Sequence, residues 1–138
     1  MGVLSENPFL VVNKIINKIS ERVDIIIVDF HAEATAEKIA MKHHLDGKVN
    51  FIFGTHTHVQ TADEEVTEKG TAYITDLGMT GPKNSVIGMD AEASLKRFIT
   101  SLPERYKLAT GECILCGVIV DINDECCRTE SIRRIYMK

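Results

Sequence analysis

Hydrophobic and polar residues follow one another along this chain in segments that predict helices and strands in turn. The segment from Pro8 to Ile19 has apolar residues at helical spacing, and Asn7 and Pro8 supply an N-cap and a first helical residue. The run from Val23 to Phe30 is almost continuously β-branched. Such a run is typical of a strand that is covered on both faces, so it predicts an inner strand of a sheet.

The remaining pattern predicts a mixed α/β domain that ends in antiparallel strands. By residue number, we expect a helix over 35–44, strands over 49–53 and 71–75, a helix over 91–100, and strands over 105–109, 113–122 and 128–136. In the helix over 91–100, Leu95, Phe98 and Ile99 are expected to face inward. Strands that alternate with helices indicate a layered α/β architecture followed by a β-meander. An inner strand needs a neighbouring strand on each side, and the chain supplies few strands for the run at 23–30. Residues 1–138 are therefore expected to form a single partial domain.

Composition narrows the class of protein. The 138 residues include 16 basic and 20 acidic side chains, and this net charge of −4 argues against binding nucleic acid through a broad basic face. The longest uncharged apolar run, Cys113 to Val120, is too short to span a bilayer, and the first residues lack the pattern of a signal peptide. A cytoplasmic location with reduced cysteines is therefore expected. A four-cysteine zinc site is disfavoured, because Cys113 and Cys116 would point to opposite faces of a strand.

Three of the five histidines follow predicted strands. His31 comes directly after one apolar strand, and His56 and His58 come after the next. The carboxyl ends of adjacent parallel strands meet at one edge of a sheet, and a His-x-His pair in extended backbone places both imidazoles on the same side. Three convergent imidazoles predict a divalent metal site suited to zinc, iron or manganese.

Other polar residues are candidates for supporting roles at this edge. His43 and His44 lie near a helix end, where a solvated or helix-capping role is expected. The acceptors available for the second nitrogen of each ligating ring are Asp29, Glu33, Asp63 and Asp76.

A glycine-punctuated loop after the third strand is a weaker candidate for substrate binding. Backbone amides of Gly78, Met79, Thr80 and Gly81 could approach a substrate phosphate. A plain surface connection explains the same residues equally well.

Three blocks of sequence, over 29–35, 54–63 and 75–82, resemble the YmdB-like family of calcineurin-like metallophosphoesterases, described as 2′,3′-cyclic-nucleotide 2′-phosphodiesterases. The resemblance implies a four-layer α/β/β/α sandwich with two metal ions, His31 and His56 binding one ion and His58 the other. The family's first-half ligands, an Asp after the opening strand, a bridging acidic residue and a Gly-Asn-His element, have no counterpart here. The chain is therefore expected to be the C-terminal half of the fold, a fragment with little activity alone.

Three functions follow as hypotheses. The first is a metal-dependent phosphodiesterase acting on cyclic nucleotides or RNA ends. Its expected partner is a complementing N-terminal half or further copies in a homo-oligomer, and no association with a membrane is expected. The second is a complete mononuclear three-histidine hydrolase in which Glu33 or Asp63 is the general base. The third is a non-catalytic half-domain for oligomerisation or binding, because missing sheet partners leave edges exposed.

Overall fold

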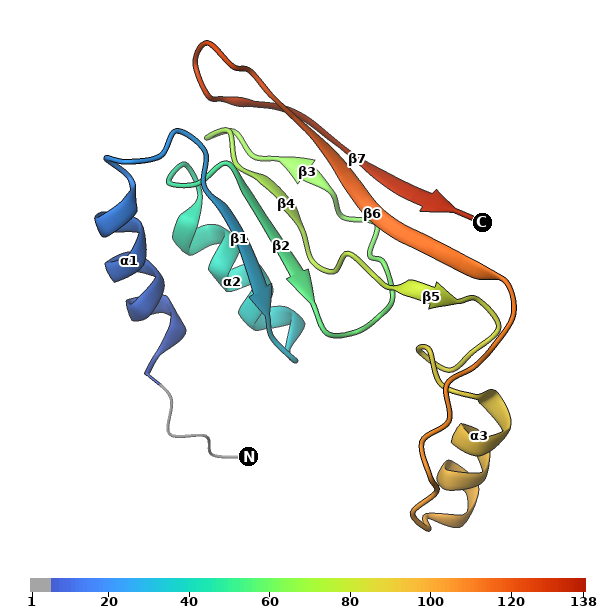
Figure 1. Ribbon diagram of the computed structural model, residues 1–138. Coiled ribbons are helices and arrows are strands. Elements are labelled where there is room, and N and C mark those ends of the chain that lie inside the picture. The colour runs from blue at the N-terminus through green and yellow to red at the C-terminus, as the bar shows by residue number, and fades with distance from the viewer. Residues whose placement is uncertain (1–5) are drawn as a thin grey trace.

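A computed structural model describes residues 6–138 as three layers with a helical projection at one end (Figure 1). The residues Met1 to Ser5, in which no signal-peptide pattern was found, lie outside the described range. The elements in chain order are α1 (Pro8–Ile19), β1 (Ile27–His31), α2 (Thr35–Leu45), β2 (Phe51–Thr55), β3 (Glu65–Val66), β4 (Ala72–Ile74), β5 (Thr80–Pro82), α3 (Ala91–Thr100), β6 (Cys113–Ile122) and β7 (Thr129–Met137).

The first sheet has the strand order β1-β2-β4-β3, and its first three strands are parallel. Side chains on β2 and β4 alternate between its two faces, as strand geometry requires. Ile52 and Tyr73 pack with α1 and α2 in one core cluster, whereas Phe51 and Ile74 belong to a second cluster on the opposite face. The predicted α/β pattern with adjacent parallel strands is confirmed.

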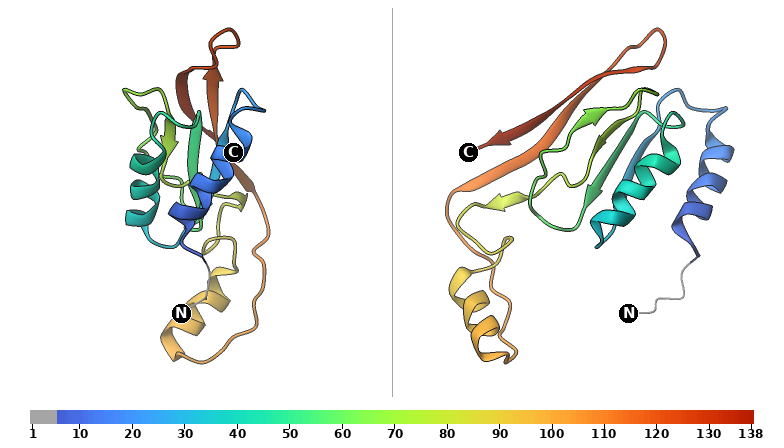
Figure 2. Two further views of the ribbon diagram at one scale, coloured as in Figure 1. Left: turned by 90° about the vertical axis from the view of Figure 1, so that its left-hand side faces the viewer. Right: turned by 180° about the vertical axis from the view of Figure 1, so that it is seen from behind.

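The second sheet, β5-β6-β7, is antiparallel, and its β6–β7 hairpin confirms the last two strands of the predicted meander. The long β6–β7 hairpin lies across the face of the first sheet that α1 and α2 leave free (Figure 2). Val118, Val120 and Ile132 of this hairpin pack on the second core cluster. Residues 6–138 thus form helix, sheet and sheet layers, and α3 projects from one end instead of covering the second sheet.

The prediction of an inner first strand is wrong for the described residues. Strand β1 begins at Ile27 instead of Val23, and it pairs only with β2, so it is an edge strand. The Ile27 side chain is 58% exposed. A β-branched run indicates that both faces become covered, but it does not show that this chain supplies the cover.

Several predictions near α3 are also wrong. Leu95, Phe98 and Ile99 are exposed, because α3 projects away from both sheets. The strand expected over 105–109 is reduced to one bridge between Leu108 and Met89. The short strands β3 and β5 were not predicted, and β5 lies inside the segment expected to be a loop.

None of the helices in residues 6–138 is long and apolar enough to cross a membrane.

Candidate functional site

His31 and His56 meet at the carboxyl edge of the parallel sheet. His31 ends β1 and is in register with Thr55, the last residue of β2. His56 therefore lies one residue beyond that pair. The Nδ1 atom of His56 lies 3.2 Å from Nε2 of His31, and the two rings are arranged edge to face at a centroid distance of 5.1 Å. The predicted meeting of imidazoles from neighbouring strand ends is confirmed for this pair.

A short chain of hydrogen bonds sets the tautomer of His31. The Thr55 hydroxyl donates to Oδ1 of Asp29 at 3.2 Å, so its oxygen accepts the proton of His31 Nδ1 at 3.0 Å. The lone pair of His31 Nε2 therefore faces His56. Asp29 thus supports His31 through Thr55, which partly matches its predicted role as an acceptor for a ligand ring.

The backbone that carries His58 differs from the extended backbone that was expected. Its Nδ1 lies 2.8 Å from the carbonyl oxygen of Ile87 and must donate to it, which leaves Nε2 as the acceptor of the neutral ring. Both His56 and His58 have positive φ, at 119° and 64°, so the assumption of extended backbone is wrong. In the part of the chain that the structure describes, no three His, Cys, Asp or Glu side chains form a group able to hold a metal. The three-histidine ligand set stays a prediction.

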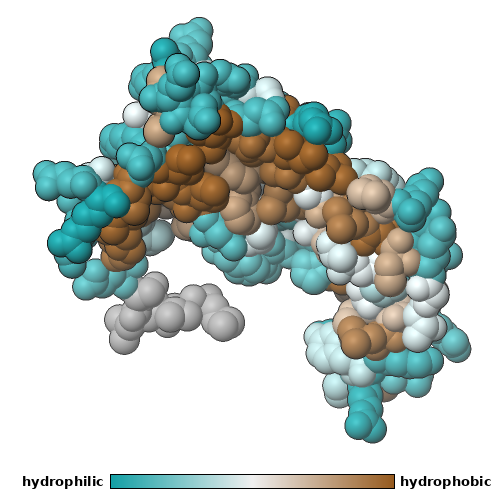
Figure 3. Space-filling model, turned by 45° about the horizontal axis from the view of Figure 1, so that its top comes forward, coloured by the Kyte–Doolittle hydropathy of each residue, from teal (hydrophilic) through white to brown (hydrophobic). Residues whose placement is uncertain are grey.

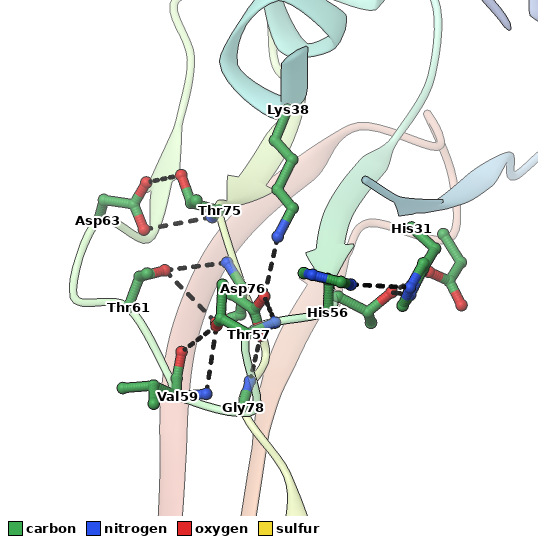
Figure 4. A network of polar contacts seen from close by, with 12 residues as sticks. His31, Lys38, His56, Thr57, Val59, Thr61, Asp63, Thr75, Asp76 and Gly78 are labelled. Atoms are coloured by element: carbon green, nitrogen blue, oxygen red, sulfur yellow. Dashed lines mark hydrogen bonds and ion pairs between the residues drawn. The ribbon is translucent and has the colours of Figure 1, made fainter. Parts of the chain in front are cut away.

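A buried ion pair lies next to the segment that holds His56 and Thr57 (Figure 4). Lys38 of α2 and Asp76, two residues after β4, are 1% and 0% exposed, and their Nζ and Oδ2 atoms are 2.9 Å apart. Asp76 Oδ2 also accepts the backbone amide of Thr57 at 2.9 Å, and Oδ1 accepts that of Gly78 at 2.9 Å. We call residues 56–61, which connect β2 to the residues before β3, the histidine loop.

The electrostatics of this pair favour the charged carboxylate. Burial raises the pKa of Asp76, but the hydrogen bonds from Lys38, Thr57 and Gly78 outweigh burial, so its pKa lies below the ordinary value. Asp76 is therefore an anion with its oxygens engaged, and it makes no direct bond to a histidine ring. Asp63 supports the same region by accepting the hydroxyl and the amide of Thr75.

Close packing at Gly54 brings these parts together. A Cβ at Gly54 would lie 1.9 Å from the Thr75 carbonyl oxygen and 2.6 Å from Cδ of Lys38. The stem of Lys38 therefore fills the space that a side chain would need two residues before His56. The spacing of Lys38, Met41 and Leu45, all buried on one face of α2, is the sequence signal that could have identified this lysine.

Several backbone groups of the glycine-punctuated loop, residues 78–81, already make hydrogen bonds within the chain. The amide of Gly78 is donated to Asp76, and Thr80 and Gly81 pair with β6 as part of β5. The carbonyl of Met79 accepts the amide of Cys116. Substrate binding by Gly78, Met79, Thr80 and Gly81 stays a prediction.

The other two histidines lie away from the sheet edge. His44 Nε2 contacts the carbonyl of Phe9 and Oδ1 of Asn13, and so links α2 to α1. His43 is exposed.

The chain is similar in sequence to two named bacterial proteins. The chain is 48% identical over 132 residues to the 2′,3′-cyclic-nucleotide 2′-phosphodiesterase of Bacillus subtilis (strain 168), covering 96% of this chain and 50% of that protein. It is 47% identical over 131 residues to a putative phosphatase/phosphodiesterase of Mycoplasma pneumoniae, covering 92% and 46%. The chain thus spans about half the length of these curated relatives.

Solved structures show the same fold. A crystal structure of a novel phosphatase from Mycoplasma pneumoniae matches with a TM-score of 0.89 at 40% identity, covering 99% of this chain and 49% of that one. A hypothetical protein from Thermus thermophilus matches with a TM-score of 0.88 at 37% identity, covering 95% and 50%. The family model described as YmdB-like protein matches residues 1–135, and the chain therefore belongs to the YmdB-like family.

Proposed function

We propose that this chain contributes His31, His56 and His58 to a metal-dependent phosphodiesterase that hydrolyses cyclic nucleotides or RNA-related phosphodiesters. The observation that supports it most is the 3.2 Å approach of His56 Nδ1 to His31 Nε2 at the carboxyl edge of the parallel sheet. The printed names of the relatives, a cyclic-nucleotide phosphodiesterase and a putative phosphatase/phosphodiesterase, support the reaction class.

The donor atoms fit a divalent metal. His31 and His58 each use Nδ1 as a hydrogen-bond donor, so each presents the lone pair of Nε2 when neutral. Imidazole nitrogens suit zinc, iron and manganese, which are the ions proposed here. A bound ion would act as a Lewis acid toward phosphoryl oxygens. The protein holds His31 through Thr55 and Asp29, and it holds His58 through the Ile87 carbonyl.

A complementing half is part of this proposal. Two adjacent cations need carboxylate ligands to offset their repulsion, because an imidazole that binds a metal contributes no negative charge. The relatives are about twice as long as the matched region, which leaves room for acidic ligands outside it. We propose that the complete domain is a four-layer α/β/β/α sandwich located in the cytoplasm. We also propose that this chain alone has little activity.

The open edge of β1 is where that half would dock. Ile27 is 58% exposed, and an apolar groove of about 330 Å³ lies between α1 and β1, lined in part by Val12, Ile15 and Val28. Figure 3 shows apolar side chains gathered in a broad band that begins beside α1. The same open edge also favours the second candidate function, a non-catalytic half-domain that associates through β1.

An activity assay separates the two candidates. The chain is incubated with a 2′,3′-cyclic nucleotide and Mn²⁺, Fe²⁺ or Zn²⁺, alone and with the half of the Bacillus subtilis relative that lies outside the match. We expect no appreciable turnover alone and metal-dependent turnover in the mixture.

Variants identify the residues responsible. His31→Ala and His56→Ala are expected to abolish turnover of the mixture, whereas His43→Ala, which changes an exposed histidine away from the edge, leaves it intact. An associated but inactive mixture would favour the non-catalytic half-domain. Robust turnover by the chain alone would contradict the need for a complementing half.

A further inference from the structure

We propose that the buried Lys38–Asp76 ion pair positions the histidine loop, and that it thereby sets the approach of His56 to His31. The inference rests on the proposed function for its catalytic meaning, but the geometry that it concerns is present in the chain itself. Lys38 and Asp76 are positioning residues, because neither touches a histidine ring among the described contacts.

The pair holds the histidine loop between its two histidines. Thr57 lies between His56 and His58, and its amide donates to the carboxylate oxygen that also accepts Lys38 Nζ, both at 2.9 Å. The positive φ of the two flanking histidines is unfavourable for residues with a Cβ, so an anchor is needed to hold this backbone. The shared carboxylate oxygen supplies that anchor.

Asp76 also holds the far end of the histidine loop. The amide of Thr61 donates to the backbone oxygen of Asp76 at 3.1 Å, and the Thr61 hydroxyl accepts the Asp76 amide at 3.0 Å. At the near end, the stem of Lys38 packs against Gly54 of β2. Asp76 therefore holds the histidine loop at Thr57 and at Thr61 (Figure 4), and Lys38 packs against β2 just before the loop begins.

A contribution to stability alone would not require charges at this place. Well-packed apolar residues often replace a buried ion pair without loss of stability, whereas a pair can specify one arrangement among several. The carboxylate here accepts three donors from three segments, namely α2, the histidine loop and the residues after β4. Such a shared acceptor fixes relative position in a way that apolar contacts do not.

The test follows ring proximity by NMR in the metal-free chain. In the unmodified chain, nuclear Overhauser contacts are expected between the rings of His31 and His56. Lys38→Met keeps the stem but removes the charge, and it is expected to abolish these contacts and to shift the Thr57 amide while circular dichroism stays native. The matched control is Lys42→Met, one turn further along α2, which breaks the Lys42–Glu65 ion pair to β3 and contacts no residue of the histidine loop. The control is expected to retain the ring contacts.

A second variant covers the case in which Lys38→Met does not fold. Lys38→Met with Asp76→Asn removes both charges, so no uncompensated ion is buried, and the same loss of ring contacts is expected. Retained ring contacts with an unshifted Thr57 amide, or failure of both variants to fold, would overturn the positioning role. Because the measurement uses neither metal nor substrate, an absence of phosphodiesterase activity would leave this result unaffected.

Discussion

Replacement of Gly54 by alanine tests the packing on which the candidate site depends. The added Cβ would lie 1.9 Å from the Thr75 carbonyl oxygen, whereas ordinary contact begins at 3.4 Å. Because the obstructing atom belongs to backbone, β2 and the end of β4 must separate by about 1.5 Å to accept one methyl group. Overpacking of a core costs about 1–3 kcal/mol, and a collision with backbone belongs at the upper end, about 3 kcal/mol.

The matched control is Gly117→Ala on β6. An added Cβ there meets nothing within 4 Å, and Gly117 is not among the glycines with positive φ. This change is expected to be neutral or to stabilise the chain by about 0.5 kcal/mol, since alanine restricts the unfolded state. For a chain of this length, the loss at Gly54 corresponds to a decrease in Tm of about 10 °C. Thermal and urea unfolding followed by circular dichroism measure both variants. Equal stability of Gly54→Ala and Gly117→Ala would refute the reasoning.

Three further outcomes are expected. Lys38→Met should lower the free energy of unfolding by about 3–5 kcal/mol in urea titrations, because it leaves a buried carboxylate unpaired, whereas Lys42→Met at its partly exposed pair should cost about 1 kcal/mol or less. The lowered pKa of Asp76 contributes stability that is present above the pKa of the unfolded state and is lost as pH falls through the folded pKa. The stability deficit of Asp76→Asn that is measured at pH 7 should therefore shrink below about pH 4. A deficit that stays constant in acid would contradict this. Ile27→Lys should weaken association with the complementing half in sedimentation experiments, while Leu95→Lys at a similarly exposed position on α3 should not; equal effects would place the docking surface elsewhere.

The parallel sheet and its carboxyl edge could be predicted from sequence because local pattern determines them. Short apolar runs ending in histidine specify both the strands and the place where His31 and His56 meet. The edge position of β1 could not be predicted. A β-branched run indicates that both faces of the strand are buried, but it does not show which segments cover those faces or which strands pair with it.

The orientation of His58 and the role of Lys38 depend on tertiary contacts that the sequence does not display. The bond from His58 to the Ile87 carbonyl joins segments 29 residues apart, and the positive φ of His58 has no marker in residue type. A lysine within a helix is usually solvated, so only its spacing with Met41 and Leu45 pointed to burial. The exposed apolar face of α3 misled the prediction because helical periodicity indicates an apolar face, not the partner that covers it.

The most direct test of the proposed metal site is a titration of the ¹⁵N-histidine-labelled chain with Zn²⁺, followed through the ring nitrogens. His31 and His56 are expected to shift together with one saturation curve, as Zn²⁺ replaces the contact between Nδ1 of His56 and Nε2 of His31, while His44, bonded to Phe9 and Asn13, stays unchanged. Unchanged ring signals of His31 and His56 at saturating Zn²⁺ would contradict the claim that these two strand ends form a metal site.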